Sequence, residues 1–164
     1  MELSRVLIVD SSPEQFITLA EKDGPRSFAI KIGTAEAVAI DRRLRGEPPV
    51  RPQTHELVDS ILRELGATVE RIVIHRLEGG TYYASLYLRT ADGVVEIDAR
   101  PSDAIALALR AKAPIFAADD VIEASAIRME EGEEDAAAAE PEQLVEDFKQ
   151  FLEDVRPEDF GADG

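Results

Sequence analysis

Cysteine is absent from this chain of 164 residues, which excludes disulfides, thiolate metal sites and cysteine nucleophiles. Only two histidines are present, His55 and His75, so a three-histidine zinc site is excluded as well. The sequence also contains no Gly-rich phosphate loop, no His-Glu-x-x-His motif, no nucleophile elbow and no dinucleotide fingerprint. The familiar signatures of nucleotide-binding proteins, zinc proteases and α/β-hydrolases are therefore missing.

Long hydrophobic runs are missing too. None approaches the roughly 20 residues that span a bilayer, and the first five residues lack the basic and apolar regions of a signal peptide. We therefore expect a cytoplasmic protein with no membrane partner. The composition, 45% hydrophobic and 32% charged, is ordinary for one globular domain with an appendage.

Negative charge is abundant but unevenly distributed. The net charge is −16, yet residues 119–164 contain 17 acidic and 3 basic residues, whereas residues 1–118 contain 17 acidic and 15 basic ones. Twelve of those 15 basic residues are arginine, which binds carboxylate and phosphate in a bidentate manner. The total charge therefore decides neither for nor against a nucleic-acid partner.

Alternating hydrophobic residues and turn signals predict two antiparallel β-meanders, each followed by a helix, in an α+β (mixed α/β) fold. The turn Asp92-Gly93 is a strong hairpin signal, and Thr34 and Thr54 are candidate helix N-caps. The predicted strands are 3–10, 15–20, 27–32, 68–77, 81–90, 94–98 and 115–117, and the predicted helices are 35–45, 55–65, 103–112 and 119–125.

The composition divides the chain into three parts. Residues 1–127 form the predicted domain, and residues 128–140 form an acidic, alanine-rich flexible linker. Residues 141–164 predict an amphipathic helical tail. A lone helix of that length is marginal in water, so its apolar stripe is expected to dock on the domain, on a second subunit or on another protein.

The stretch 96–110 combines a strand end, a charged corner and a helix with almost no polar face. A helix that is apolar all round is normally buried on more than one side. Its N-terminus would then lie beside Asp98, Arg100 and Asp103, where a cluster of charged groups forms either a site or a structural clamp.

Three tyrosines lie in the predicted strand 81–90, with Tyr83 and Tyr87 on one face and Tyr82 on the other. An aromatic strand can stack nucleic-acid bases. Tyrosines in a sheet more often serve packing, which is the interpretation that we favour.

Polar residues at the ends of the predicted elements suggest phosphodiester hydrolysis. Carboxylates would hold Mg²⁺ or Mn²⁺, a base would activate water, and a cation would bind phosphate. The candidate metal ligands are Glu36, Asp98 and Asp103, the candidate base is His55, and the candidate phosphate-binding residues are Arg51 and Arg100. The same residues could instead form ion pairs and helix caps.

Four segments carry a family resemblance: Ile32–Ile40, Arg51–Leu57, Gly80–Ala84 and, most specifically, Asp98–Ala108. On these segments the chain resembles the bifunctional nuclease family of small bacterial and plant proteins, over about residues 3–127. The resemblance implies a mixed α/β domain that is oligomeric, and it places Glu36, His55, Asp98, Arg100 and Asp103 at matching family positions.

The function expected from the residues and the resemblance is a nuclease of low sequence specificity. It would hydrolyse DNA and RNA with a divalent metal, with His55, Glu36, Asp98 and Asp103 as catalytic residues, and it would form a homo-oligomer, most simply a dimer. The alternative is a non-catalytic regulatory module whose tail helix engages a protein partner or a neighbouring subunit.

Overall fold

The structure of the protein, a computed structural model, describes residues 2–7, 15–22 and 24–125. Contacts divide the chain into two units, Met1–Ala126 and Ile127–Gly164, and the described residues all lie in the first. The predicted linker 128–140 and tail helix 141–164 lie outside the described residues. The three-part division of the chain therefore stays a prediction.

The first sheet is the predicted N-terminal meander. Its strands are β1 (Glu2–Leu7), β2 (Gln15–Ala20) and β3 (Ser27–Ile32), in the order β1-β2-β3 and antiparallel throughout. Alternate residues of β2 and β3 enter the core, among them Ile17, Leu19, Phe28 and Ile30. This period of two is what places one face of a strand against a core.

The second sheet contains the other predicted meander and one further strand. Its strands are β4 (Thr68–Glu78), β5 (Thr81–Thr90), β6 (Gly93–Ala99) and β7 (Ile115–Ala117), in the order β6-β5-β4-β7. The meander is antiparallel, and β7 pairs with β4 in parallel. That parallel pair needs a crossover, which the helix between β6 and β7 provides.

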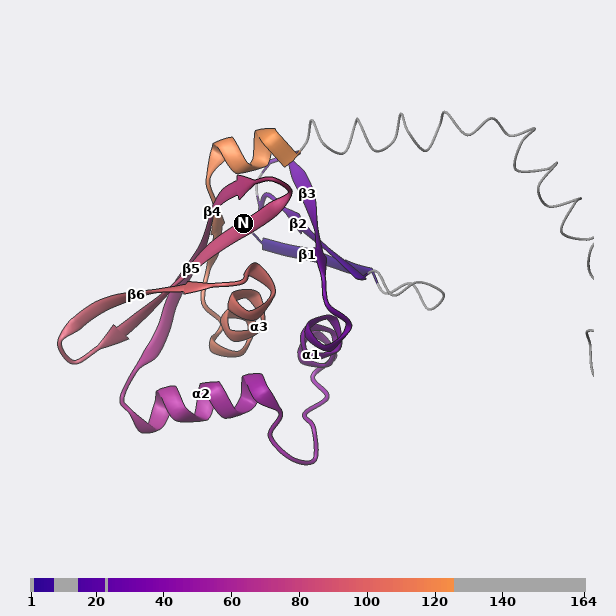
Figure 1. Ribbon diagram of the computed structural model, residues 1–164. Coiled ribbons are helices and arrows are strands. Elements are labelled where there is room, and N and C mark those ends of the chain that lie inside the picture. The colour runs from indigo at the N-terminus through magenta and orange to yellow at the C-terminus, as the bar shows by residue number, and fades with distance from the viewer. Residues whose placement is uncertain (1, 8–14, 23, 126–164) are drawn as a thin grey trace, which may run out of the picture. The chain divides into compact units, whose positions relative to one another are not determined.

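That helix, α3 (Pro101–Ala111), lies at the centre of the domain, where it contacts α1, α2, β4 and β5 (Figure 1). Its residues Pro101, Ser102 and 104–108 are buried, as its lack of a polar face predicts. The α+β fold with two meanders is thus confirmed, and α3 is the element around which they pack.

The other long helices are α1 (Thr34–Arg45) and α2 (Thr54–Glu64). Thr34 and Thr54 were predicted as N-caps, but both are already helical, and the caps are Gly33 and Gln53. In α2 the Glu56 carboxylate accepts a hydrogen bond from the Gln53 backbone N–H at 3.0 Å, which satisfies a group that a threonine cap would leave unpaired. A short helix over 119–125 closes the described chain.

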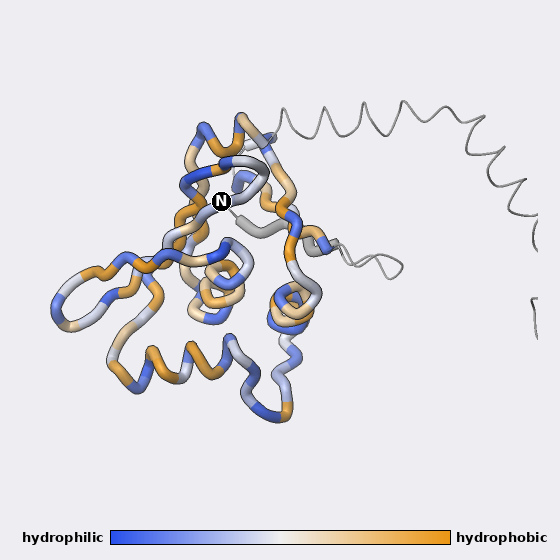
Figure 2. The backbone as a smooth tube through the Cα atoms, viewed as in Figure 1, coloured by the Kyte–Doolittle hydropathy of each residue, from blue (hydrophilic) through white to orange (hydrophobic). Residues whose placement is uncertain are grey.

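Helix α2 has no fully buried residue. Val58 and Leu62 pack against the core from one side of it, whereas Leu57, Ile61 and Leu65 keep 54%, 48% and 76% of their surface exposed. Figure 2 shows these hydrophobic positions alternating with polar ones along the helix. Charged contacts therefore matter more for holding α2 than they do for α3.

The tyrosines of β5 divide between the two faces as predicted. Tyr82 packs inward, stacked on Phe28 with ring centroids 5.9 Å apart. Tyr83 and Tyr87 lie on the opposite face, where the guanidinium groups of Arg76 and Arg71 lie 3.9 and 4.0 Å from the ring centroids. The predicted packing role is therefore confirmed for Tyr82. Tyr83 and Tyr87 form cation–π pairs with the two arginines on the other face of the sheet.

Candidate functional site

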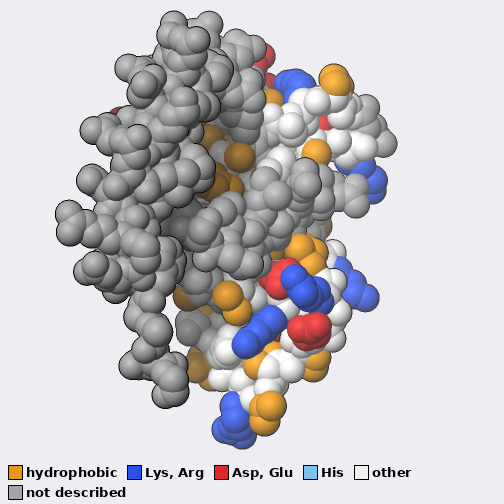
Figure 3. All heavy atoms as spheres, turned by 90° about the vertical axis from the view of Figure 1, so that its right-hand side faces the viewer, with side chains coloured by type: hydrophobic (Ala, Val, Ile, Leu, Met, Phe, Trp, Pro, Cys, Tyr) orange, Lys and Arg blue, Asp and Glu red, His pale blue; other side chains and the backbone are white. Residues whose placement is uncertain are grey.

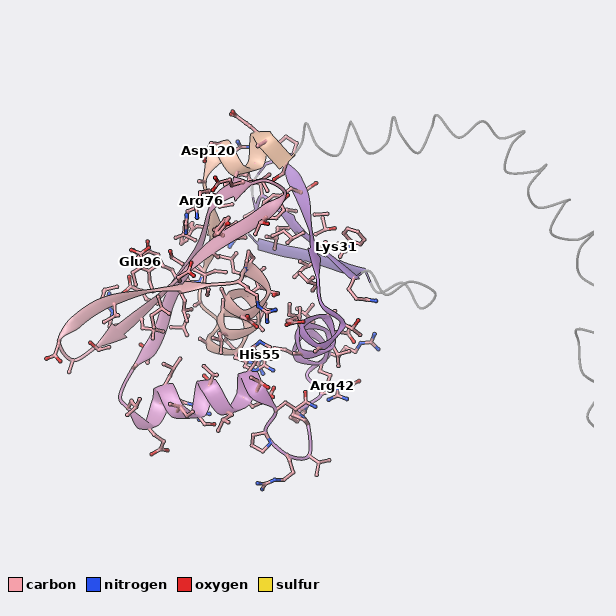
Figure 4. The ribbon with its side chains drawn as sticks, in the orientation of Figure 1. Lys31, Arg42, His55, Arg76, Glu96 and Asp120 are labelled. Atoms are coloured by element: carbon pink, nitrogen blue, oxygen red, sulfur yellow. The ribbon has the colours of Figure 1, made fainter. Side chains whose placement is uncertain are left out.

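Three helix N-termini meet at one place in the domain. Glu36 is the third residue of α1, His55 the second of α2 and Asp103 the third of α3. Figure 4 shows His55 rising from α2 towards the start of α3. Each helix presents the positive end of its dipole here, which favours negatively charged side chains and anions.

Arg100, the N-cap residue of α3, joins the two carboxylates. Its Nε donates to Asp103 Oδ2 at 2.7 Å, and its Nη2 donates to Asp103 Oδ1 at 3.2 Å and to Glu36 Oε1 at 2.6 Å. The guanidinium therefore holds one carboxylate in a fork and reaches the other with the same nitrogen. Arginine is suited to this because its donors are fixed in one plane.

Burial within the cluster is uneven. The side chains of His55 and Glu36 keep 12% and 14% of their surface exposed, and that of Asp103 keeps 31%, whereas that of Arg100 keeps 67%. The carboxylates thus form the floor of the site, and the guanidinium covers them from the solvent side. A phosphate that approaches from solvent meets Arg100 first.

Asp103 is ionised in this environment. Burial alone would raise the pKa of its carboxyl group, but hydrogen bonds from Arg100 and His55 outweigh burial and hold that pKa below its ordinary value. The pKa of the Arg100 guanidinium is raised by the same contacts with Asp103 and Glu36. Asp103 and Arg100 therefore face each other as an ionised carboxylate and a charged guanidinium.

The contact between His55 and Asp103 indicates which ring nitrogen of His55 carries the proton. His55 Nε2 lies 3.0 Å from Asp103 Oδ1, and an ionised carboxylate can only accept, so Nε2 carries the proton. In the neutral ring, Nδ1 then holds a lone pair. A carboxylate that orients a histidine in this way is a common arrangement for a general base.

Two of the predicted site residues are not joined to this cluster. Asp98 is exposed on β6, opposite Ser85 of β5, and its side chain makes no hydrogen bond or ion pair with any described residue. Arg51 is exposed in the connector before α2 and likewise has no such contact with the part of the chain that the structure describes. Four of the six predicted residues, Glu36, His55, Arg100 and Asp103, are therefore brought together.

The described residues contain no group of three His, Asp or Glu side chains placed to hold a metal ion. Of the three expected ligands, Glu36 and Asp103 lie together, and both accept hydrogen bonds from Arg100. Two carboxylates with the other positions filled by water and phosphate oxygens is a usual set for Mg²⁺. The residues thus fit an ion that binds together with substrate rather than a preformed three-carboxylate cage.

A largely buried ion pair that the sequence analysis missed joins α2 to α3 next to His55 in the chain. Arg110 of α3, with 8% of its side chain exposed, pairs with Glu56 of α2, and its Nε donates to Glu56 Oε1 at 3.1 Å. Burial alone would raise the pKa of the Glu56 carboxyl group, but the contact with Arg110 outweighs burial and holds that pKa below its ordinary value. The sequence does place an acidic residue in the first turn of α2 and a basic residue in the last turn of α3. Nothing in the local sequence showed that these two helices are in contact.

The arginines in the last turn of α1 make contacts of their own. Arg43 donates to the carbonyl oxygens of Leu109 and Arg110 at the end of α3, both at 3.3 Å, and Arg45 pairs with Asp41. Arg42 lines a cavity of about 670 Å³ between α1, α2 and α3, but none of the four clustered residues lines it. The cavity and the charged cluster are therefore separate features.

Where the face drawn in Figure 3 shows described residues, basic and acidic side chains lie next to one another.

Comparison with known proteins decides the family. A model described as the bifunctional nuclease domain matches residues 17–130. The chain belongs to this family. The match begins within β2 and covers the charged cluster and every later described element, so the resemblance noted from the four sequence segments is confirmed.

The chain is similar to relatives of two kinds. An uncharacterized protein of Mycobacterium tuberculosis is 39% identical over 147 residues, 89% of this chain and 88% of that protein. Bifunctional nuclease 1 and bifunctional nuclease 2 of Oryza sativa subsp. japonica are 29% and 30% identical over 110 and 112 residues. These cover 65% and 66% of this chain but only 33% and 34% of the longer rice proteins.

The family therefore supports a nuclease-related role with a nucleic-acid substrate. Within the described residues, no helix combines the length and the apolar character needed to cross a membrane.

Proposed function

We propose that this protein is a nuclease of low sequence specificity that hydrolyses phosphodiester bonds in DNA and RNA at the cluster of Glu36, His55, Arg100 and Asp103. One observation carries the proposal: Arg100 bridges Glu36 and Asp103 on the solvent side of a carboxylate-bound histidine. Phosphodiester hydrolysis needs a base for water and a cation for the developing phosphorane charge, and the cluster supplies both.

In this proposal His55 Nδ1 takes a proton from water as the water oxygen bonds to phosphorus. The P–O bond to the leaving sugar oxygen breaks, and that oxygen takes a proton from solvent. The Nε2–H bond to Asp103 holds the ring in place and stabilises the imidazolium that results. Arg100, whose side chain is exposed to solvent, turns some of its N–H groups to the phosphate oxygens. The three helix N-termini add positive potential at the same place.

Metal dependence stays a prediction. Glu36 and Asp103 would hold the ion, which when bound would supply Lewis-acid polarisation of a phosphate oxygen. The experiment is cleavage of single-stranded DNA and RNA with Mg²⁺ or Mn²⁺, repeated in excess chelator. We expect chelator to abolish cleavage and added metal to restore it, whereas full activity in chelator would remove the metal from the proposal.

The site assignment is tested by His55→Ala, Asp103→Asn and Arg100→Gln, each with its melting temperature. We expect losses in kcat/KM of about 10²–10⁴-fold for the first two and about 10²–10³-fold for the third. Arg45→Gln, which removes a surface arginine paired with Asp41, is the matched control and should keep wild-type activity. Wild-type rates in all three site variants would refute the assignment.

Two predicted roles outside the cluster can be measured in the same assay. Asp98 as a catalytic or metal-binding residue and Arg51 as a phosphate-binding residue both stay predictions, tested by Asp98→Asn and Arg51→Gln. We expect a smaller loss of kcat/KM in Asp98→Asn than in Asp103→Asn, because Asp98 is exposed whereas Asp103 is bonded to Arg100.

The alternative function, a non-catalytic binding module, has one observation in its favour. The bonds of Arg100 also tie the start of α1 to the start of α3, which is what a structural clamp does. A wild-type protein without cleavage activity, together with a severe drop in melting temperature for Arg100→Gln, would favour the module over the nuclease.

A further inference from the structure

The cavity between α1, α2 and α3 has no part in the proposed function. Its volume is about 670 Å³, within the range of pockets that hold small-molecule ligands. The end of α1, one side of α2, the start of β4 and the end of α3 all contribute to its wall. Pro48 and Pro49 of the connector between α1 and α2 complete it, and because proline fixes its backbone torsion, this part of the wall is stiff before any ligand binds.

The charge on the cavity wall is positive once its ion pairs are set aside. Four arginines and three carboxylates of the described residues line the cavity. Two of these arginines are held by two of the carboxylates, Arg110 by Glu56 and Arg63 by Asp59. The two arginines at the end of α1 remain, together with one carboxylate, that of the exposed Glu47. The wall therefore has one positive charge in excess, which favours an anionic ligand.

Arg42 is the residue of this wall whose donors are unused. It is half-buried, and its guanidinium makes no hydrogen bond or ion pair with any described residue. Figure 4 shows Arg42 at the end of α1, next to the connector that leads to α2. A guanidinium carries five N–H donors, and polar groups that leave the solvent are normally hydrogen-bonded. Arg42 therefore has donors free for an anion in the cavity.

The carbonyl groups at the two helix ends do not use these donors. Basic residues in the last turn of a helix often bond to its terminal carbonyls. At the end of α1, the carbonyl oxygens of Arg42 and Arg43 instead accept hydrogen bonds from the backbone N–H groups of Glu47 and Gly46, at 2.9 and 3.3 Å. At the end of α3, Arg43 already donates to two carbonyl oxygens. Capping of the helix ends thus accounts for Arg43 but not for Arg42.

We propose that this cavity binds a small phosphate monoester of nucleotide size, with the phosphate at Arg42 and Arg43. Guanidinium groups bind phosphate oxygens through paired, charge-assisted hydrogen bonds. The organic part of the ester packs on the aliphatic side chains of Leu62 and Val69, and Thr68 adds a hydroxyl group beside them. The proposal is independent of the proposed function, because none of the four clustered residues lines the cavity.

A ligand in this cavity acts on α2. Asp59, Leu62 and Arg63 of α2 line the cavity, and α2 has no fully buried residue of its own. A ligand that binds only while α2 is in place stabilises that position by mass action. Since α2 also carries His55, the cavity is a place where a small phosphate ester controls how firmly that histidine is held.

Calorimetric titration of the full chain tests the class of ligand, with adenosine 5′-monophosphate (AMP), inorganic phosphate and adenosine as the probes. We expect AMP to bind, inorganic phosphate to bind about tenfold more weakly because it leaves the aliphatic wall uncovered, and adenosine not to bind. No binding of AMP at millimolar concentration would overturn the proposal. Adenosine or inorganic phosphate binding as tightly as AMP would overturn it as well, because the phosphate or the organic part would then not be recognised.

Variants of the wall test the position of the ligand. Arg42→Gln should weaken AMP binding roughly 10–100-fold and leave the melting temperature unchanged, since this guanidinium has no partner among the described residues. Thr68→Glu places a negative charge in the wall and should also weaken binding. The matched control is Arg45→Gln in the same helix turn, because Arg45 pairs with Asp41 and does not line the cavity. Wild-type affinity in both wall variants would overturn the proposal.

Arg100→Gln separates this cavity from the charged cluster, where Arg100 could also attract phosphate. We expect Arg100→Gln to bind AMP as the wild type does, because Arg100 does not line the cavity. Loss of AMP binding in Arg100→Gln, together with normal binding in Arg42→Gln, would place the ligand at the charged cluster and refute this site.

Hydrogen exchange measures the effect on α2 without any activity assay. At an AMP concentration ten times the dissociation constant of the wild type, the α2 amides should exchange about tenfold more slowly than without ligand. At the same AMP concentration, exchange in Arg42→Gln should slow by no more than about twofold, because the variant is largely unoccupied. Tight binding of AMP without slower exchange in α2 would contradict a site whose wall includes that helix.

Discussion

Asp103 is the residue on which the charged contacts of the site converge, and this has a consequence for stability. Its pKa is lower in the folded domain than in the unfolded chain, because Arg100 and His55 favour the ionised form despite burial. A carboxyl group of this kind stabilises the fold above its unfolded pKa of about 4 and loses that contribution as the pH falls through the folded pKa.

The first prediction follows from the lowered pKa of Asp103 in the folded domain. Below about pH 4, the free energy of unfolding of the wild type should fall more steeply with decreasing pH than that of Asp103→Asn. Denaturant titrations between pH 3 and pH 7 measure the difference. Asp98→Asn, at an exposed carboxylate, is the control for loss of charge alone. Equal pH dependence in wild type and Asp103→Asn would contradict the contacts described.

Gly33 offers a way to disturb the site without removing a charge. A Cβ added there would lie 2.2 Å from Glu36 Oε2, so Gly33→Ala forces that carboxylate away from its present position against Arg100. If Glu36 acts in catalysis, kcat/KM should fall by roughly 10–100-fold with a small change in melting temperature. Unchanged activity would show that the placement of Glu36 is not needed.

At the scale of elements, the pair of Glu56 and Arg110 fixes α2 to α3. Removing one partner leaves a largely buried charge, so Arg110→Met should lower the free energy of unfolding by about 3 kcal/mol. Glu56→Leu combined with Arg110→Met should recover much of that loss. Urea titrations of the two single variants and the double variant measure the coupling, and additive losses would contradict it.

The elements themselves were largely predictable because their signals are local. The apolar run Ala104–Leu109 predicted the burial of α3, and Asp92-Gly93 predicted the β5–β6 hairpin. The pairing of β7 with β4 was not predictable, because a three-residue strand carries little local signal and its partner lies about 40 residues earlier in the chain. The N-caps of α1 and α2 were each predicted one residue too late. In α2 the N-cap is Gln53, whose backbone N–H donates to the carboxylate of Glu56, three residues later.

The four members of the charged cluster could be named from the sequence, but the bonds between them could not. Glu36, His55 and Asp103 each stand in the first turn of a helix, which is a sequence signal, but their meeting depends on how three helices pack. Asp98 was grouped with them because it lies close in sequence. Strand alternation instead places it with Glu96 on the outer face of β6.

At the scale of the whole domain, the hydroxyl group of Tyr82 connects distant parts. It lies 3.0 Å from Ser125 Oγ and 3.3 Å from the carbonyl oxygen of Ala29, so β5, β3 and the helix 119–125 meet there. Tyr82→Phe should lower the free energy of unfolding by about 1 kcal/mol and leave nuclease activity unchanged. Thermal unfolding and cleavage rates on the same preparation check both parts, and a loss of activity would link this region to the site.

The loose packing of α2 sets a temperature limit on any chemistry at the site. Helices with few buried side chains detach in local openings that need less free energy than global unfolding, and α2 carries His55. Hydrogen exchange of the α2 amides should therefore become rapid on warming while the amides of α3 remain protected. Activity should be lost with α2, several degrees before the domain melts, and it should return on cooling because the core never opened.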